Sequence, residues 1–139
     1  MDVKTLTIRL STKGHGDVTD ITPNVINSVM ETGLKNGLVN IFSPSSTSAL
    51  TTIEFESGCI SDLNRLFDEI VNPERHYDHN ARWGDGNGHS HVRAALLGPS
   101  LAVPFREGKL SLGTWQQIIF VDFDNRARQR ELVVQVLGV

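Results

Sequence analysis

Most of the side chains that could perform acid–base or metal chemistry lie in one stretch of the chain, residues 75–93. The stretch holds four of the five histidines, together with two aspartates, three arginines and three glycines. Neutral imidazoles beside a carboxylate are the usual ligands of a catalytic transition-metal site, and histidine also exchanges protons near neutral pH. We therefore expect this stretch to form the functional site, on a scaffold made by the rest of the chain.

The expected metal ligands within this stretch are His79, Asp85 and His91. His89 is a weaker candidate, because a helix that begins at Ser90 would point His89 and His91 in different directions. Imidazole ligands favour zinc or manganese over magnesium as the divalent metal. The alternative interpretation is a glycine-rich polar loop whose histidines are simply solvated.

A glycine-rich run, Gly84–Gly88, precedes the helix expected over residues 91–97. Free N–H groups at the start of a helix can bind phosphate, and Arg82 and Arg93 could add charge-assisted hydrogen bonds. The run matches neither a P-loop nor a dinucleotide-binding fingerprint. A plain loop capped by Ser90 is therefore an equally good interpretation.

The rest of the chain alternates between short apolar strands and amphipathic helices. Strands are expected over residues 4–11, 18–20, 38–42, 51–55, 101–105, 118–123 and 131–137, and helices from Pro23, over 60–71 and over 91–97. Several strands are joined by turns too short for a parallel crossover, including a charged hairpin tip at residues 124–130. The pattern predicts an α+β fold, a largely antiparallel β-sheet or sandwich with two to three helices, in a single domain of residues 1–139.

Some residues outside the histidine stretch allow two interpretations. Glu54 lies on an apolar strand, so it either faces solvent or is a buried carboxylate with a raised pKa and a function. Cys59, the only cysteine, is interpreted as a small buried apolar residue, and Trp115 as a core residue. Ile118–Ile119 and Leu132–Val134 are apolar at consecutive positions, so both faces of these strands need cover, and subunit contact is one way to supply it.

The composition excludes some classes of partner. The net charge of −3 and a pI near 5.9 argue against a general nucleic-acid binder, which needs a basic face. No apolar run approaches the roughly 18 residues that span a bilayer, and the first residues lack the apolar core of a signal peptide. We expect a soluble, cytoplasmic protein without a membrane or nucleic-acid partner.

Several motifs resemble the YjbQ-like family, and together they cover nearly the whole chain. They are Tyr77–Asn80, Gly84–Gly98 and Gly108–Gln116, with Pro44–Leu50 and Glu54 as further matching parts. The Gly-Thr-Trp-Gln sequence at 113–116, combined with the upstream histidine pair, is highly specific to this family.

The resemblance implies a compact α+β subunit that assembles as a homotrimer, with a small phosphorylated molecule as its partner. It also implies a thiamine-phosphate synthase activity, as a secondary activity in some members, which joins a pyrimidine-methyl pyrophosphate to a thiazole phosphate and releases pyrophosphate. The site implied by the resemblance is built around His79, Asp85 and His91, with Glu54, Thr47 and Gln116 nearby.

Taken together, these arguments predict an enzyme, a thiamine-phosphate synthase-like transferase with a His/Asp site that binds a divalent metal. The predicted catalytic residues are His79, Asp85, His91 and Glu54, and the predicted phosphate- or ligand-binding residues are Thr47, Arg82, Asn87, Ser90 and Gln116. Two alternatives stay open: a metal-dependent hydrolase of a small phosphate or ester, and a trimer that binds a ligand or metal without catalysis.

Overall fold

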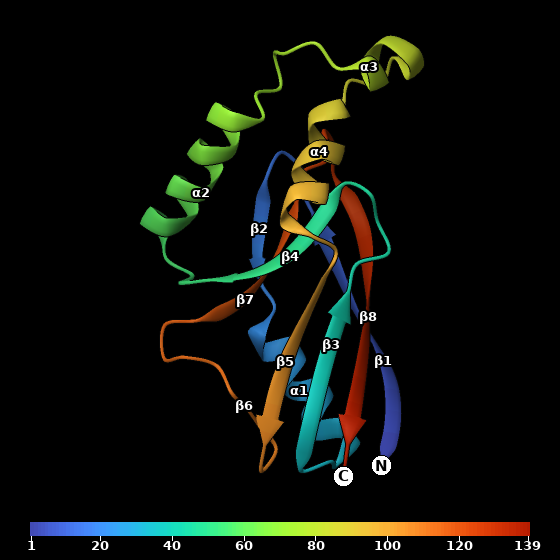
Figure 1. Ribbon diagram of the computed structural model, residues 1–139, viewed down its shortest axis with the longest axis vertical. Helices are drawn as coiled ribbons and strands as arrows, with labels where there is room; N and C mark the ends of the chain where they lie inside the picture. Colours follow the sequence, from blue (N-terminus) through green and yellow to red (C-terminus); the bar gives the residue numbers. More distant parts are fainter.

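The computed structural model describes all 139 residues, as two antiparallel β-sheets with four helices (Figure 1). The elements in chain order are β1 (Asp2–Thr12), β2 (Asp17–Asp20), α1 (Thr22–Thr32), β3 (Asn36–Phe42), β4 (Ser48–Ile53), α2 (Ser57–Ile70), α3 (Asp78–Trp83), α4 (Gly88–Leu97), β5 (Ser100–Arg106), β6 (Lys109–Leu110), β7 (Gln117–Asp122) and β8 (Arg128–Gly138). The larger sheet has the order β1-β8-β3-β5-β6 and the smaller β2-β7-β4. The predicted α+β class and the antiparallel pairing are confirmed.

The larger sheet is built by strands whose apolar residues alternate with polar ones. In β1 the inward residues include Ile8, which lies opposite Leu132 of β8, while Thr7 and Arg9 point outward. Helix α1 packs on the inward face, and its Val25 and Val29 are fully buried against the strands. This contact forms the main hydrophobic core between the larger sheet, α1 and β7.

Strand β7 is the central strand of the smaller sheet and is buried on both faces. Ile118 belongs to the main core, whereas Ile119 belongs to a second core with Phe67 of α2 and Ala94 of α4. Both isoleucines are 0% exposed within one chain, so they need no subunit contact. In contrast, Val133 of β8 remains 38% exposed on the outer face of the larger sheet.

The histidine stretch contains more helix than the sequence predicted. Residues 78–83 form α3, and α4 begins at Gly88 with Asn87 rather than Ser90 as its N-cap. Gly84, with a φ of 72° that favours glycine, ends α3. The amide oxygen of Asn80 then accepts a hydrogen bond from the N–H of Gly88 at 2.8 Å, which ties the end of one helix to the start of the next.

Two further boundaries differ from the prediction. Strand β4 ends at Ile53, so Glu54 lies in the turn that leads to α2 rather than on the strand. Helix α2 begins at Ser57, because the Glu56 carboxylate accepts hydrogen bonds from the N–H groups of Gly58 and Cys59. None of the four helices is long and apolar enough to span a bilayer.

Candidate functional site

Helices α3 and α4 bring two histidines together at one end of the molecule (Figure 1). His79 lies in the first turn of α3 and His91 in the first half of α4. Their ring centroids are 4.4 Å apart, and the planes are tilted by 56°. The two imidazoles predicted to converge therefore do so, although twelve positions separate them in the chain.

The loop between the two helices supplies two polar partners for His79. Its Nε2 lies 3.2 Å from a carboxylate oxygen of Asp85 and 3.1 Å from the amide oxygen of Asn87. His79 and Asp85 are partly exposed, while Asn87 is buried. Asp85 is fixed in turn through its backbone carbonyl, which accepts a hydrogen bond from the Asn125 side chain at 2.7 Å.

The hydrogen bonds of Asn87 determine which nitrogen of His79 carries the proton. The amide nitrogen of Asn87 donates to Asp124 at 3.2 Å, and an ionised carboxylate can only accept. The amide oxygen must therefore face His79, whose Nε2 has to donate to it. This leaves Nδ1 of His79 as the nitrogen with a free lone pair, available for a proton or a cation.

Asp124 is the centre of a buried charge network. Its side chain is 1% exposed and accepts hydrogen bonds from Asn87, from Arg128 Nε at 2.8 Å and from the N–H of Asn125 at 2.8 Å. Burial on its own would raise the pKa of Asp124, but these hydrogen bonds and the charge of Arg128 lower it to about 2. The carboxylate is therefore ionised at neutral pH.

A second aspartate–arginine pair lies beside the first. Asp122 is fully buried and forms a two-point contact with Arg130, whose Nε and Nη2 lie 2.8 and 3.0 Å from its two oxygens. Thr12 donates to Asp122 at 2.6 Å, and Arg130 Nη2 also donates to the hydroxyl of Thr47 at 2.9 Å. The network thus continues from His79 as far as β1.

The sequence prediction did not include these four charged residues in the site, since it interpreted Asp122 as part of the strand over 118–123 and residues 124–130 as a charged hairpin tip. The signal was nevertheless in the spacing. Asp122 and Asp124, like Arg128 and Arg130, are two positions apart, so each pair points to one side of an extended chain. Opposite charges at matching spacing on two nearby segments indicate ion pairing rather than a solvated turn.

These groups surround a hollow of about 310 Å³, named here the polar hollow. Apart from a proline, its lining is polar or charged, and it consists of Pro44, Ser45, Ser46, Thr47, Asn87, His91, Asp124, Arg128 and Arg130. A neighbouring hollow of about 270 Å³ shares Ser45, Ser46 and His91, and is completed by Ser48, Ala94, Ala95 and Pro99. His91 therefore lies where an apolar-walled space meets a charged one.

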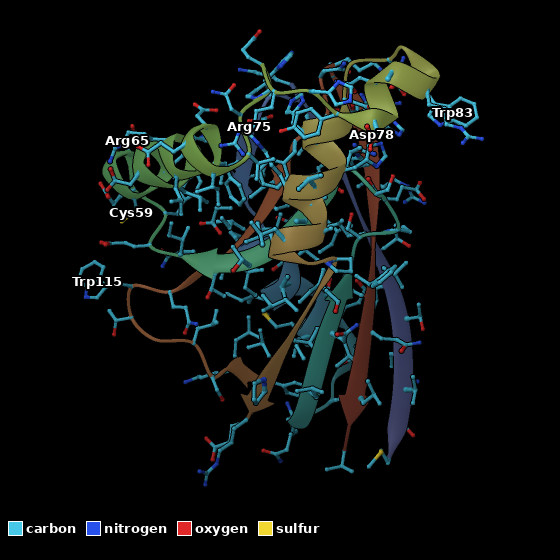
Figure 2. The ribbon with its side chains drawn as sticks, turned by 45° about the horizontal axis from the view of Figure 1, so that its top comes forward. Cys59, Arg65, Arg75, Asp78, Trp83 and Trp115 are labelled. Atoms are coloured by element: carbon cyan, nitrogen blue, oxygen red, sulfur yellow. The ribbon has the colours of Figure 1, made fainter.

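Two predicted site residues, Glu54 and Gln116, do not lie beside the histidine pair or line either hollow. Glu54 follows β4, and Gln116 donates to the Thr52 hydroxyl at 3.1 Å in the β6–β7 connection. Figure 2 shows Trp115 of this connection and Cys59 of α2 on the opposite side of the molecule from Asp78 and Trp83, which bound α3. Trp115 is 72% exposed, so its predicted place in the core is wrong.

Three more residues of the histidine stretch do not line the polar hollow, and two of them serve the fold. Ser90 is fully buried and donates to the carbonyl of Phe123, so it anchors α4 instead of facing the hollow. Arg93 is buried and donates to the carbonyl of Val71 and to Asp68. Arg82 is exposed and lies over the ring of the neighbouring Trp83.

His89 points away from His91, as the helical geometry predicted. Its ring is 8% exposed, lies 6.2 Å from that of Tyr77, and its Nδ1 has no hydrogen-bond partner. Burial, followed by the charges of Arg93 and His15, lowers the pKa of His89. His89 is therefore a neutral, structural side chain and not a member of the imidazole pair.

The ring nitrogens of the pair are of the type that binds a divalent transition-metal cation. Nδ1 of His79 and a ring nitrogen of His91 are the two candidates, and open positions would remain for substrate. Asp85 shares a hydrogen bond with Nε2 of His79, an arrangement that orients a metal-binding imidazole from outside. The geometry thus favours an orienting role for Asp85.

A different cluster has more closely spaced ligand atoms. Those of Glu54, Glu56 and Cys59 all lie within 4.8 Å of one another, and they form the only such group of three in the chain. The carboxylate of Glu56 caps α2 and also accepts a hydrogen bond from the thiol of Cys59. That hydrogen bond, with burial, raises the pKa of the Cys59 thiol, so neither a thiolate ligand nor a nucleophile is favoured there. The interpretation of Cys59 as a buried apolar residue was wrong, because Cys59 is half-buried beside a carboxylate.

The fold and site define a class of small α+β proteins with two antiparallel sheets and a histidine pair at the junction of two helices. A model of the UPF0047 protein YjbQ-like family matches residues 6–139. The chain belongs to this family, as the motifs around the two histidines and the Gly-Thr-Trp-Gln sequence predicted.

Relatives and solved structures of the same family match nearly the full length. A UPF0047 protein of Methanothermobacter thermautotrophicus is 40% identical over 138 residues, covering 99% of this chain and 94% of that protein. The UPF0047 protein YugU of Bacillus subtilis is 32% identical, covering 95% of this chain and 98% of its own. The crystal structure of a YbjQ-like protein from Sulfolobus solfataricus superposes with a TM-score of 0.94 at 37% identity, covering 99% of both chains.

Proposed function

We propose that this protein is a transferase with thiamine-phosphate synthase-like activity, joining a pyrimidine-methyl pyrophosphate to a thiazole phosphate. The observation that carries the proposal is the meeting of two imidazoles, His79 and His91, beside a hollow lined by hydroxyl and guanidinium groups. One half of such a site suits proton transfer or cation binding, and the other suits a phosphorylated substrate.

Each residue has a role that follows from its contacts. Asp85 and Asn87 hold the His79 ring so that Nδ1 is free, and His91 faces the space where the substrate would lie. When bound at the imidazole pair, a divalent cation, zinc or manganese, would supply positive charge against the leaving pyrophosphate. Thr47 also lines the polar hollow, where its hydroxyl donates to Asp124 and accepts from Arg130, so it positions these groups beside the substrate's phosphate.

The test is a coupling assay with the two phosphorylated halves and purified protein. We expect product with the native chain and a loss of about a hundredfold or more in rate with His79→Ala or His91→Ala. His76→Ala is the matched control, because His76 precedes the same helix but is exposed and bonds only to Asp78. Product at background level with a large excess of native enzyme would refute the proposal.

Metal binding has a separate readout. Protein purified without added metal is expected to carry zinc or manganese, and His79→Ala with His91→Ala should lose it while keeping the native circular dichroism spectrum. The Cys59→Ser variant serves as control, since Cys59 belongs to the competing cluster near α2. Metal retained by the histidine variants and lost by the cysteine variant would move the metal site to that cluster.

A second candidate is a metal-dependent hydrolase of a small phosphate or ester. The neighbouring hollow favours it, because three serines line an apolar-walled space that reaches His91, where a water could be activated next to a small ester. Turnover of generic esters without any coupling product would select this candidate. Intact ligand recovered with the purified protein, and no turnover with any metal, would instead indicate a binding protein without catalysis.

We also propose that the chain assembles as a homotrimer through the outer face of the larger sheet. Helix α1 lies behind this sheet, and no helix lies in front of β3, β5 and β8 (Figure 1). The outward residues there include Leu38, Phe42 and Val133, each between 38% and 40% exposed. The register places Phe42 next to Val133, and Leu38 next to Pro104, so an uncharged surface crosses three strands.

The number of subunits comes from the family resemblance, and light scattering tests it. A trimer of 15.3 kDa chains has a mass of about 46 kDa. Phe42→Glu should dissociate it, because a carboxylate would enter an uncharged contact. Thr114→Glu, a change in the exposed β6–β7 connection away from this sheet face, is the control. A native chain that is monomeric at micromolar concentration would exclude the assembly.

A further inference from the structure

The geometry points to Arg128 and Arg130 as the phosphate-binding residues of the polar hollow, with the two buried aspartates holding the guanidinium groups in position. The inference rests on the proposed function in that it concerns the same site. It places anion binding at β8 and the turn at residues 45–47. The sequence alone had instead suggested the start of α4, with Arg82, as the phosphate site.

Both arginines are fixed before any ligand arrives. Arg130 meets the two oxygens of Asp122 with two nitrogens, and Arg128 meets Asp124 through Nε and Nη2 at 2.8 and 2.7 Å. The two residues alternate along β8, so their side chains emerge on one face of the strand. Because the side chains are already ordered, binding an anion costs less conformational entropy than it would with free arginines.

The guanidinium groups keep donors to spare. All their hydrogen bonds use Nε or Nη2, and Nη1 of each arginine has no partner within the chain. Both side chains line the polar hollow, and Arg128 is 32% exposed. The exposed Ser46 adds a hydroxyl without a side-chain hydrogen bond in the structure. Two planar N–H groups and a hydroxyl suit phosphate oxygens.

The aspartates do not form a cation site. Asp122 accepts from Thr12 and Arg130, while Asp124 accepts from Asn87, Arg128 and a backbone N–H, so the oxygens of both are occupied. Two negative and two positive charges also cancel, which leaves directed donors rather than net charge to select the ligand. An anion here should therefore bind more tightly when a cation occupies the nearby imidazole pair, and the reverse must hold equally.

Binding of inorganic phosphate and of pyrophosphate by calorimetry tests the assignment. We expect the native chain to bind pyrophosphate more tightly than phosphate, and Arg128→Gln to weaken it about tenfold or more, as the loss of a charge-assisted hydrogen bond predicts. Arg126→Gln is the matched control, because Arg126 is exposed in the same turn and its side chain makes no hydrogen bond. It should bind within about twofold of the native chain.

Loss of Arg130 could unfold the protein by leaving Asp122 buried and unpaired. Arg130→Lys keeps the positive charge but removes the two-point contact, and the double change Asp122→Asn with Arg130→Gln removes both charges together. Both variants should fold by circular dichroism and bind pyrophosphate about tenfold more weakly. Inorganic phosphate should be weakened by the same variants. If the native chain binds phosphate more tightly than pyrophosphate, the two arginines hold the phosphate of the thiazole substrate rather than the pyrophosphate.

The outcomes separate this inference from the proposed reaction. Unchanged binding in Arg128→Gln and in the folded Arg130 variants, an equal loss in Arg126→Gln, or no binding by the native chain would overturn the assignment. His79→Ala should abolish coupling yet keep pyrophosphate binding without metal, because His79 does not line the polar hollow. Intact anion binding in a chain that couples nothing would refute the transferase and leave the assignment supported.

Discussion

Replacing Asp124 with Asn removes the charge at the centre of the buried network. The side chain is 1% exposed and accepts hydrogen bonds from Asn87, Arg128 and the backbone of Asn125. An amide can still accept from Arg128, but it leaves that guanidinium without its counter-charge. The perturbation is therefore electrostatic and changes the side-chain volume very little.

The magnitude follows from the pKa. Asp124 has a pKa of about 2 in the folded protein against 3.8 ordinarily, a difference that corresponds to roughly 2 kcal/mol of folding free energy. Because the folded pKa is the lower one, this contribution is complete well above pH 3.8 and is lost as the pH falls toward 2. About half should remain at pH 3. The unpaired Arg128 brings the expected loss in Asp124→Asn to about 2 to 3 kcal/mol at pH 7.

Urea unfolding at pH 7 and at pH 3, followed by circular dichroism, measures the effect. The native chain should lose stability between these values, and the difference between native chain and variant should shrink by about 1 kcal/mol at pH 3. Asp17→Asn is a control, since Asp17 is the partly exposed first residue of β2 and its side chain accepts only from the backbone N–H of Lys13, outside the aspartate–arginine network. A difference that is the same at both pH values would refute the assignment of the low pKa to Asp124.

Three further predictions concern the helices that carry the histidines. Asn87→Ala should weaken zinc or manganese binding about tenfold or more by releasing the ring of His79, as measured by competition with a chelator. His89→Phe should reduce the loss of stability between pH 7 and pH 5, because the pKa of buried His89 is lowered and the unfolded chain takes up a proton more readily than the folded one. An unchanged pH slope in urea unfolding would contradict this. Gly88→Ala should lower coupling activity more than stability, since its Cβ would lie 2.6 Å from the side chain of Tyr77 and push α3 away from α4; a variant with native kcat and Tm would disprove it.

The strands and the convergence of the histidines could be predicted from local pattern. Alternation in residues 4–11 and the apolar run at 118–123 specify β1 and β7, because a half-buried and a fully buried strand differ in their periodicity. Gly84 and Gly86, both with positive φ, let the chain reverse between the two histidines. These features depend on residues close in sequence.

The rest depends on contacts that no local pattern contains. Helix α3 has six residues and no buried side chain, so it shows no amphipathic signal, and Asn80 fixes its end by bonding to Gly88. The burial of Asp122 and Asp124 follows from the position of β8, which pairs in the larger sheet while β7 pairs in the smaller. The two aspartates and their arginine partners therefore come together in the site, because the chain passes from the smaller sheet to the larger one between Asp122 and Arg128.

The residues that match the family motifs lie at two separate places in the folded chain. The histidine loop and the 44–48 segment line the hollows, whereas Gln116 and Glu54 lie near α2 and the β6–β7 connection. A sequence motif shows which residues are present but not which of them lie close together in the structure. The sequence therefore could not separate these two groups.

The long pairing of β1 with β8 has a consequence for biosynthesis. Thr12 of β1 and Arg130 of β8 meet at Asp122, and the two strands are paired from Asp2 with Gly138 to Thr12 with Arg128. A nascent chain still lacking its last dozen residues has neither arginine and leaves the first strand without a neighbour. Such a chain exposes an open sheet edge, so the larger sheet and the buried charge network can be completed only together, once β8 has been synthesised and has paired with β1.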